Sequence, residues 1–200
     1  MKNVFRTVHI YAVVATVLLG LSLGGCGTKP YLVVNTPRPT TAPPPNMARI
    51  YFMKPGGSMQ KAYTMILENE KVVGYLQNRT VFYLDVPAGE HFFMSVSSIT
   101  EGLKASLAGG KTYYVRLYSS PGAKSLLLGG SEDVHMEPLV PGTEGWDQRL
   151  IWVDGATLIT VNPEYAAKWE MRNAANNAER LEKFRSGEAE AKLLGPEQGE

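Results

Sequence analysis

The chain has little cysteine, little histidine and little net charge. Of its 200 residues, one is cysteine and three are histidine, and 20 basic side chains stand against 19 acidic ones. A single cysteine excludes a disulfide within the chain, so packing alone must hold its folded part together. The near balance of charge excludes a protein that binds nucleic acid through a strongly basic surface, and no nucleic-acid partner is expected.

Long apolar runs are scarce as well. The main one is the uncharged stretch 10–25, which follows the basic residues Lys2 and Arg6. At roughly 16 residues it falls short of the ~20 that a membrane-spanning helix needs. A positive start, a short apolar run and small residues at its end are typical of a secretory signal peptide, predicted here for residues 1–25.

The residues that end this signal are Leu23-Gly24-Gly25-Cys26, and they resemble the lipobox of bacterial lipoproteins. Small residues let a signal peptidase approach the backbone, and the thiol of Cys26 is the nucleophile that accepts a diacylglyceryl group. A buried thiol or an uncleaved anchor would suit this junction of apolar and polar chain less well. By the sorting rule of that family, Gly27 after the cysteine implies the outer membrane of the cell envelope, with the domain facing the periplasm.

Residues 26–46 are predicted to combine the lipidated, palmitate-bearing Cys26 with a tether. Six prolines lie between residues 27 and 46. Such a composition favours an extended polyproline-like chain of ~3.1 Å per residue, which would reach roughly 60 Å from a membrane. Two roles are open for the apolar segment 31–34: a short strand that docks on the domain, or an apolar patch within the tether.

From residue 47 the hydrophobic pattern changes to a period of two. The alternating segments are 48–55, 62–68, 71–76, 79–86, 91–97 and 111–118. Turn residues separate them: Asn69, which can take a positive φ, suits a hairpin, and Pro87 to Glu90 form another turn. Six short strands at this spacing predict a mainly β fold, a small antiparallel β-sandwich over residues 47–161.

Three stretches of this region resemble a family of bacterial lipoproteins that carry a domain of unknown function. They are A-R-I-Y-F-M-K-P at 48–55, V-F-Y-L-D-V-P-A-G-E-H at 81–91 and L-A-G-G-K-T-Y-Y-V-R-L at 107–117. They are also similar, more loosely, to the β-sandwich domains named for the motif P-E-G-A. Because the matching residues are mostly turn and core residues, the resemblance implies a fold and a compartment, and no catalytic residue.

The C-terminal part predicts one more hairpin and one helix. Segments 149–153 and 157–161 flank Asp154-Gly155 as two strands flank a turn. Asn162 is a suitable N-cap before a proline, and Gly187 is a suitable stop, so a C-terminal α-helix is expected within residues 162–187. Residues 188–200 are predicted to be a disordered acidic tail.

One face of this helix is expected to cover the open side of the sandwich rather than to bind a partner. Residues at helical spacing on the candidate face are Met171, Ala174, Ala178 and Leu181, with Tyr165 and Trp169 on a neighbouring stripe.

Two groups of side chains are candidate functional residues. The tyrosines Tyr51, Tyr83, Tyr114 and Tyr118 fall opposite the predicted core faces. If their strands are neighbours, they form a row suited to stacking on sugars or docking an apolar partner, and the C-terminal helix is expected to cover it. Asp133, His135 and Glu137 share one strand face and could hold a metal ion, although a solvated acidic strand is the simpler interpretation.

No catalytic motif is complete. The pattern G-x-S-x-G does not occur, and the glycine that a phosphate loop would need is Ala105. We therefore expect a non-enzymatic, lipid-anchored envelope lipoprotein without metal or cofactor, a binding or structural module. Its expected partners are the membrane, through Cys26, and an envelope protein or glycan. The alternative is a metal-dependent or hydrolytic envelope enzyme using Asp133 to Glu137, and the test is whether His135 lies beside other carboxylates.

Overall fold

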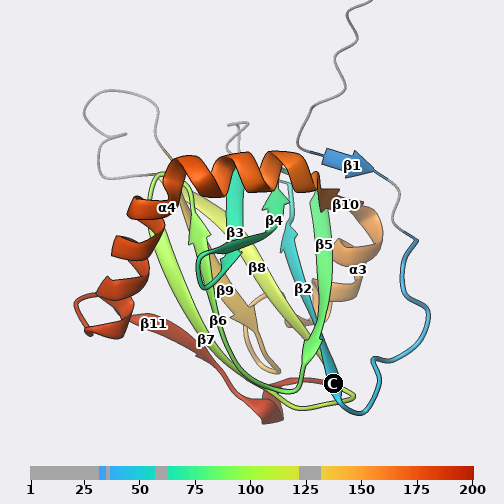
Figure 1. Cartoon of the computed structure of the whole chain (residues 1–200). Coiled ribbons are helices and arrows are strands. Elements are labelled where there is room, and N and C mark those ends of the chain that lie inside the picture. The colour runs from blue at the N-terminus through green and yellow to red at the C-terminus, as the bar shows by residue number, and fades with distance from the viewer. Residues whose placement is uncertain (1–31, 35–36, 57–62, 122–131) are drawn as a thin grey trace, which may run out of the picture. The chain divides into compact units, whose positions relative to one another are not determined.

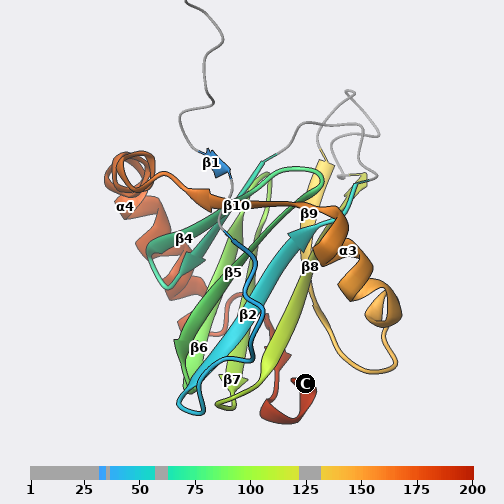
Figure 2. The same ribbon diagram turned by 90° about the vertical axis from the view of Figure 1, so that its right-hand side faces the viewer.

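The computed structural model describes residues 32–34, 37–56, 63–121 and 132–200. From residue 32 onward the described residues form two packed β-sheets, with one helix on the outer side of each (Figures 1 and 2). The mainly β fold class with a C-terminal helix is therefore confirmed. The predicted signal peptide 1–25 and Cys26 lie outside the described residues.

The first sheet contains, in spatial order, β10 (Thr157–Val161), β5 (Thr80–Pro87), β2 (Met47–Lys54), β8 (Thr112–Pro121) and β9 (Glu132–Leu139), and the short β1 (Leu32–Val34) pairs with β10 at its edge. The second sheet contains β11 (Ala191–Leu194), β7 (Thr100–Leu107), β6 (Gly89–Val96), β3 (Thr64–Glu68) and β4 (Lys71–Leu76).

The pairing of strands differs from the expected all-antiparallel arrangement at three places. The pairs β10–β5, β2–β8 and β11–β7 are parallel. Parallel neighbours cannot be joined by a tight turn, so these strands come from distant parts of the chain. The turn predicted at residues 87–90 carries the chain from one sheet to the other. The strand β5 ends in the first sheet at Pro87, and β6 begins in the second sheet at Gly89, which has a φ of 136°.

The core lies between the two sheets, and the period of two placed the core residues of β2, β5 and β8 correctly. Ile50 and Phe52 of β2 are fully buried there, while Arg49 and Tyr51 point to the outer face. Phe82, Phe93, Leu103, Tyr113, Val115 and Leu117 complete this interior. On β6 it is Phe93 that lies between the sheets, whereas Phe92, Met94 and Val96 face α4. The predicted hairpin is also present, since β3 and β4 pair antiparallel around Asn69, whose φ is 53°.

The C-terminal helix α4 (Pro163–Arg185) begins and ends as predicted. The Asn162 side chain accepts hydrogen bonds from the backbone N–H groups of Glu164, at 2.9 Å, and Tyr165, at 3.4 Å. Gly187, with a φ of 81°, follows the last turn. A side-chain oxygen that satisfies the free N–H groups of the first turn is what an N-cap supplies.

The buried face of α4 is not the one expected. Met171 is 75% exposed, and Ala174 and Ala178 are exposed as well. The face that packs on the second sheet instead contains Tyr165, Ala166, Trp169, Asn177, Leu181 and Phe184. Large side chains bury more apolar area than alanines, so the aromatic stripe is the one that faces Met65, Tyr75 and Met94.

The hairpin predicted at residues 149–161 is wrong. Residues Arg149–Gly155 form the short helix α3, preceded by the 3₁₀ turn η1 (Trp146–Gln148), and only the second segment is a strand, β10. A short apolar run fits either a strand or one side of a helix, and here Val153 is buried together with Trp146 and Trp152 against the first sheet.

Both ends of the described chain pack onto the domain, unlike the tether and tail that were expected. Arg38 donates to the carbonyl oxygens of Val153 (2.5 Å), Asp154 (3.1 Å) and Ala156 (2.6 Å) at the end of α3. Residues 32–34 form a strand, the first of the two roles left open for this segment. In the predicted tail, β11 pairs with β7, and the Glu200 backbone exchanges two hydrogen bonds with Thr112.

Candidate functional site

The predicted tyrosine row exists as an aromatic face on the outer side of the first sheet. In the strand register Tyr51 lies opposite Tyr83 on one side and Tyr114 on the other. The ring centroids are 5.7 Å apart for Tyr51 and Tyr83 and 5.6 Å apart for the stacked pair Tyr51 and Tyr114. We call Tyr51, Tyr83, Tyr114 and Tyr118 the aromatic face.

The cover of this face is not α4, which packs on the other sheet (Figure 2). Residues 146–156 cover the Tyr114 part of it instead. The Trp146 ring meets Tyr114 edge-on, with centroids 6.3 Å apart, and the Arg149 guanidinium lies 5.4 Å from the Tyr114 centroid. The Tyr114 hydroxyl donates to Glu200 Oε1 at 2.8 Å. Burial, and secondly the hydrogen bond to Glu200, raises the pKa of Tyr114 far above its ordinary value.

Tyr51 and Tyr83 are only half-buried, and a charged pair borders them. Arg49 Nε and Nη2 donate to Asp85 Oδ1 and Oδ2 at 2.7 and 2.8 Å, and the same guanidinium lies 5.2 Å from the Tyr83 centroid. The hydrogen bond to Asp85 raises the pKa of Arg49, and burial raises the pKa of Tyr51. This end of the face therefore consists of two half-buried aromatic rings beside the ion pair that the buried Arg49 forms with Asp85.

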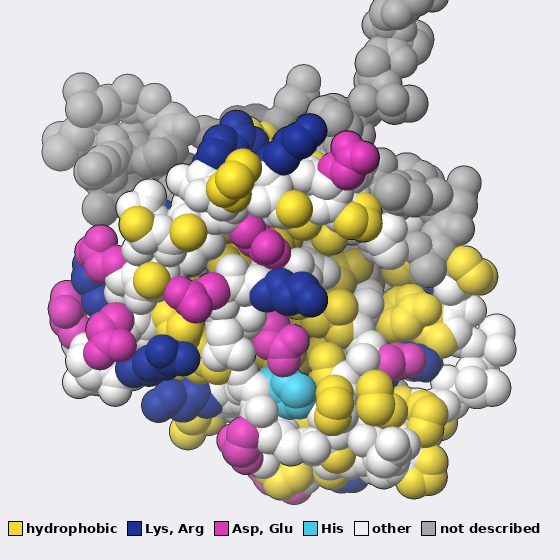
Figure 3. Space-filling model, viewed as in Figure 1, with side chains coloured by type: hydrophobic (Ala, Val, Ile, Leu, Met, Phe, Trp, Pro, Cys, Tyr) yellow, Lys and Arg dark blue, Asp and Glu magenta, His cyan; other side chains and the backbone are white. Residues whose placement is uncertain are grey.

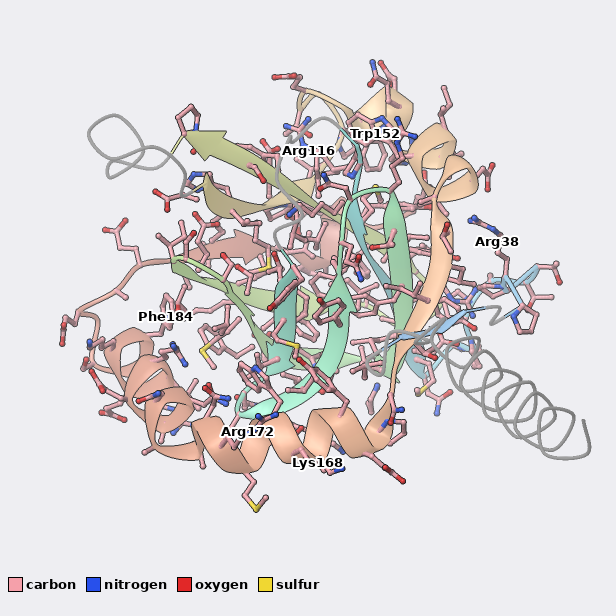
Figure 4. All side chains as sticks on the ribbon, turned by 90° about the horizontal axis from the view of Figure 1, so that it is seen from above. Arg38, Arg116, Trp152, Lys168, Arg172 and Phe184 are labelled. Atoms are coloured by element: carbon pink, nitrogen blue, oxygen red, sulfur yellow. The ribbon has the colours of Figure 1, made fainter. Side chains whose placement is uncertain are left out.

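Tyr118 is the most exposed of the four, at 39%. Arg116 lies between its ring and that of Trp152, at 5.2 and 5.5 Å from the two centroids, and Figure 4 shows Arg116 and Trp152 side by side near α3. Arg116 also donates to Glu137 Oε2 through Nε at 2.9 Å and Nη2 at 2.5 Å. Glu137 is thus engaged by an arginine.

The three residues considered for a metal site have three different sets of partners. Asp133 accepts from the Ser98 hydroxyl at 3.2 Å, and Glu137 pairs with Arg116. His135 contacts Glu101 and Ser120. Within the described ranges, no group of three or more His, Cys, Asp or Glu is placed to hold a metal ion.

Sequence reasoning missed Glu101, the carboxylate beside His135. It belongs to β7 in the second sheet, and its side chain reaches the edge strand β9 of the first. Its Oε2 accepts from Met136 N at 2.6 Å and from Lys192 Nζ at 3.0 Å, and Lys192 also donates to Met136 O at 2.5 Å. Burial alone would raise the pKa of Glu101, but the hydrogen bonds from Met136, His135 and Lys192 outweigh it and lower that pKa.

The face of the molecule drawn in Figure 3 has no strong patch of one charge among the described residues. In Figure 3 basic and acidic side chains are interspersed among apolar ones. Among the described residues, no helix has both the length and the apolar character needed to cross a bilayer.

Comparison with family models, with curated proteins and with solved structures finds no match for this chain.

Proposed function

We propose that the chain is a lipid-anchored lipoprotein of the bacterial cell envelope whose two-sheet domain acts as a binding or structural module. The observation that carries this proposal is Leu23-Gly24-Gly25-Cys26 at the end of an uncharged run that begins after Arg6. A thiol in this position accepts the diacylglyceryl group, and the amino group released by cleavage can accept a further acyl chain. Two or more chains give stable membrane anchoring.

The aromatic face supports a binding role. Tyr118 stands exposed beside Arg116, and the half-buried Tyr51 and Tyr83 stand beside Arg49. Aromatic rings stack on sugar rings or on apolar side chains. The guanidinium groups of Arg49 and Arg116 are already paired with Asp85 and Glu137, so the recognition surface is aromatic, and an envelope protein or a glycan fits it. Because Trp146 and Arg149 already cover Tyr114, the available surface is the two ends of the row.

The lipid anchor is tested by Cys26→Ser expressed in a Gram-negative bacterium with labelled palmitate. We expect no label and accumulation of the unprocessed precursor, because the hydroxyl does not replace the thiol as acyl acceptor. Thr28→Ser, two residues beyond the cysteine, is the matched control and should be labelled and processed normally. Normal processing or labelling of Cys26→Ser would contradict the proposal.

The binding role is tested by crosslinking in intact envelopes, followed by affinity capture of the full chain. Tyr118→Ala should reduce capture of a specific partner while lowering the melting temperature by only a few degrees, because its ring is partly solvated. Tyr63→Ala is the matched control, since Tyr63 is 57% exposed and packs instead beside Tyr75 in the second sheet. Equal capture by wild type, Tyr118→Ala and Tyr63→Ala would argue against the aromatic face.

A further inference from the structure

Three side chains at the edge of the first sheet form a chain of hydrogen bonds. Ser120 Oγ lies 2.8 Å from His135 Nε2, and His135 Nδ1 lies 2.7 Å from Glu101 Oε1. Ser120 and His135 come from the paired strands β8 and β9, and Glu101 comes from β7 in the other sheet. A hydroxyl, an imidazole and a carboxylate connected in this order are the arrangement that activates a nucleophilic serine.

The hydrogen-bond partners decide which nitrogen of His135 carries the proton. An ionised carboxylate only accepts, so Nδ1 donates to Glu101, and Nε2 is left with a lone pair facing the Ser120 hydroxyl. This is the tautomer a general base needs. Glu101 is kept as an acceptor by Met136 N–H and by Lys192, and its side chain is only 18% exposed.

His91 provides an internal contrast. Its Nδ1 lies 2.6 Å from Glu68 Oε1, and its Nε2 lies 2.8 Å from the carbonyl oxygen of Pro87. Both partners are acceptors, so neither nitrogen of His91 faces a hydroxyl whose proton it could take. Beyond Cys26 the chain has two histidines, and His135 alone has the geometry of a base.

The surroundings of Ser120 limit the substrates it could use. Ser120 and His135 are both partly exposed, and the Tyr118 ring, 5.2 Å from the His135 ring, offers an apolar platform. Pro121 follows the serine and has no N–H, so the backbone donor that commonly stabilises an oxyanion next to a nucleophile is missing. A slow reaction with donors that carry a good leaving group fits this arrangement.

We propose that Ser120 is a nucleophile that accepts acyl groups from activated carboxylic esters, with His135 as its base and Glu101 as the residue that positions the base. The Oγ–acyl bond forms while the ester C–O bond breaks, and the Oγ proton passes through Nε2 to the leaving alcohol. Water then adds to the acyl carbon, gives a proton through Nε2 back to Oγ, and releases the carboxylic acid. This activity goes beyond the binding module and does not depend on lipid anchoring.

The test is covalent labelling of the purified full chain, in detergent, with a fluorophosphonate probe. An Oγ–P bond forms, the P–F bond breaks, and fluoride leaves while His135 takes the proton. We expect mass spectrometry of the labelled wild type to locate the probe on Ser120, and Ser120→Ala to lose the label. His135→Gln should slow labelling by about 100-fold or more, the range that a general base contributes.

Matched controls separate activation from folding. Ser119→Ala and His91→Gln change a neighbouring serine and the other histidine, and both should label at the wild-type rate. Glu101→Gln should lower the rate, because the amide does not hold the imidazole as the carboxylate does, and Glu101→Asp, which keeps a carboxylate, should recover part of it. Absence of label on Ser120 in the folded wild type would overturn the proposal, and so would a wild-type labelling rate in His135→Gln.

Discussion

The ring of Phe82, in β5, lies directly against Gly74, in β4, and so fills the interface between the two sheets at a position where the opposing residue has no side chain. A Cβ at Gly74 would overlap atoms of that ring. Phe82 in turn stacks on Phe52, with centroids 5.2 Å apart, and Phe52 meets Phe93 of the second sheet edge-on. The close approach of the sheets here therefore depends on a glycine.

Gly74→Ala should destabilise the domain by about 1–3 kcal/mol, because the added methyl group must displace a ring held between two sheets. Urea unfolding followed by circular dichroism measures this change. Gly155→Ala is the control, since a Cβ there meets no atom within 4 Å. It should stay within about 0.5 kcal/mol of the parent. Equal stability of the two variants would contradict the packing described for Phe82.

Tyr114 and Tyr118 lie on the same face of β8 and should respond very differently to truncation. Tyr114 is 5% exposed and hydrogen-bonded to Glu200, whereas Tyr118 is 39% exposed. Tyr114→Ala should cost roughly 3–5 kcal/mol, as truncation of a buried aromatic ring does. Tyr118→Ala should cost about 1 kcal/mol or less. Thermal melts of both decide this, and comparable losses would mean that residues 146–156 do not cover Tyr114.

Acid should weaken the junction between β9 and the second sheet through Glu101. Its pKa is lowered in the folded state, so its ionised form contributes stability above its ordinary value of 4.5, and this contribution disappears as the pH falls through the lowered value. The difference in unfolding free energy between wild type and Glu101→Gln should therefore be largest near neutral pH and shrink below about pH 4.5. A difference that is independent of pH would show that Glu101 is not ionised in this junction.

Local signals in the sequence predicted most of the elements. Alternation placed Ile50 and Phe52 inside and Tyr51 outside, and Asn162 and Gly187 marked the ends of α4. The aromatic row followed from the same alternation once β2, β5 and β8 proved to be neighbours. These features depend on a few adjacent residues, so a single sequence is enough to indicate them.

What the sequence did not reveal depends on distant parts of the chain. The short run 149–153 is apolar enough for a strand, and only its fit over Tyr114 and Val81 makes a helix the better solution. Glu101 and His135 are 34 residues apart and lie in different sheets, so no spacing connects them. The stripe of α4 that became buried is the one with the larger apolar side chains, which helical spacing alone did not single out.

The packing of residues 37–46 against the domain shortens the free stretch of chain between Cys26 and the domain. Arg38 is tied to the end of α3, Arg49 donates to the carbonyl oxygen of Thr41, and Leu32 already belongs to β1. Six residue steps separate Cys26 from Leu32, which extend to about 20 Å at most, rather than the roughly 60 Å of a free proline-rich tether. A lipidated Cys26 would therefore keep the β1 edge of this domain within about 20 Å of the membrane surface.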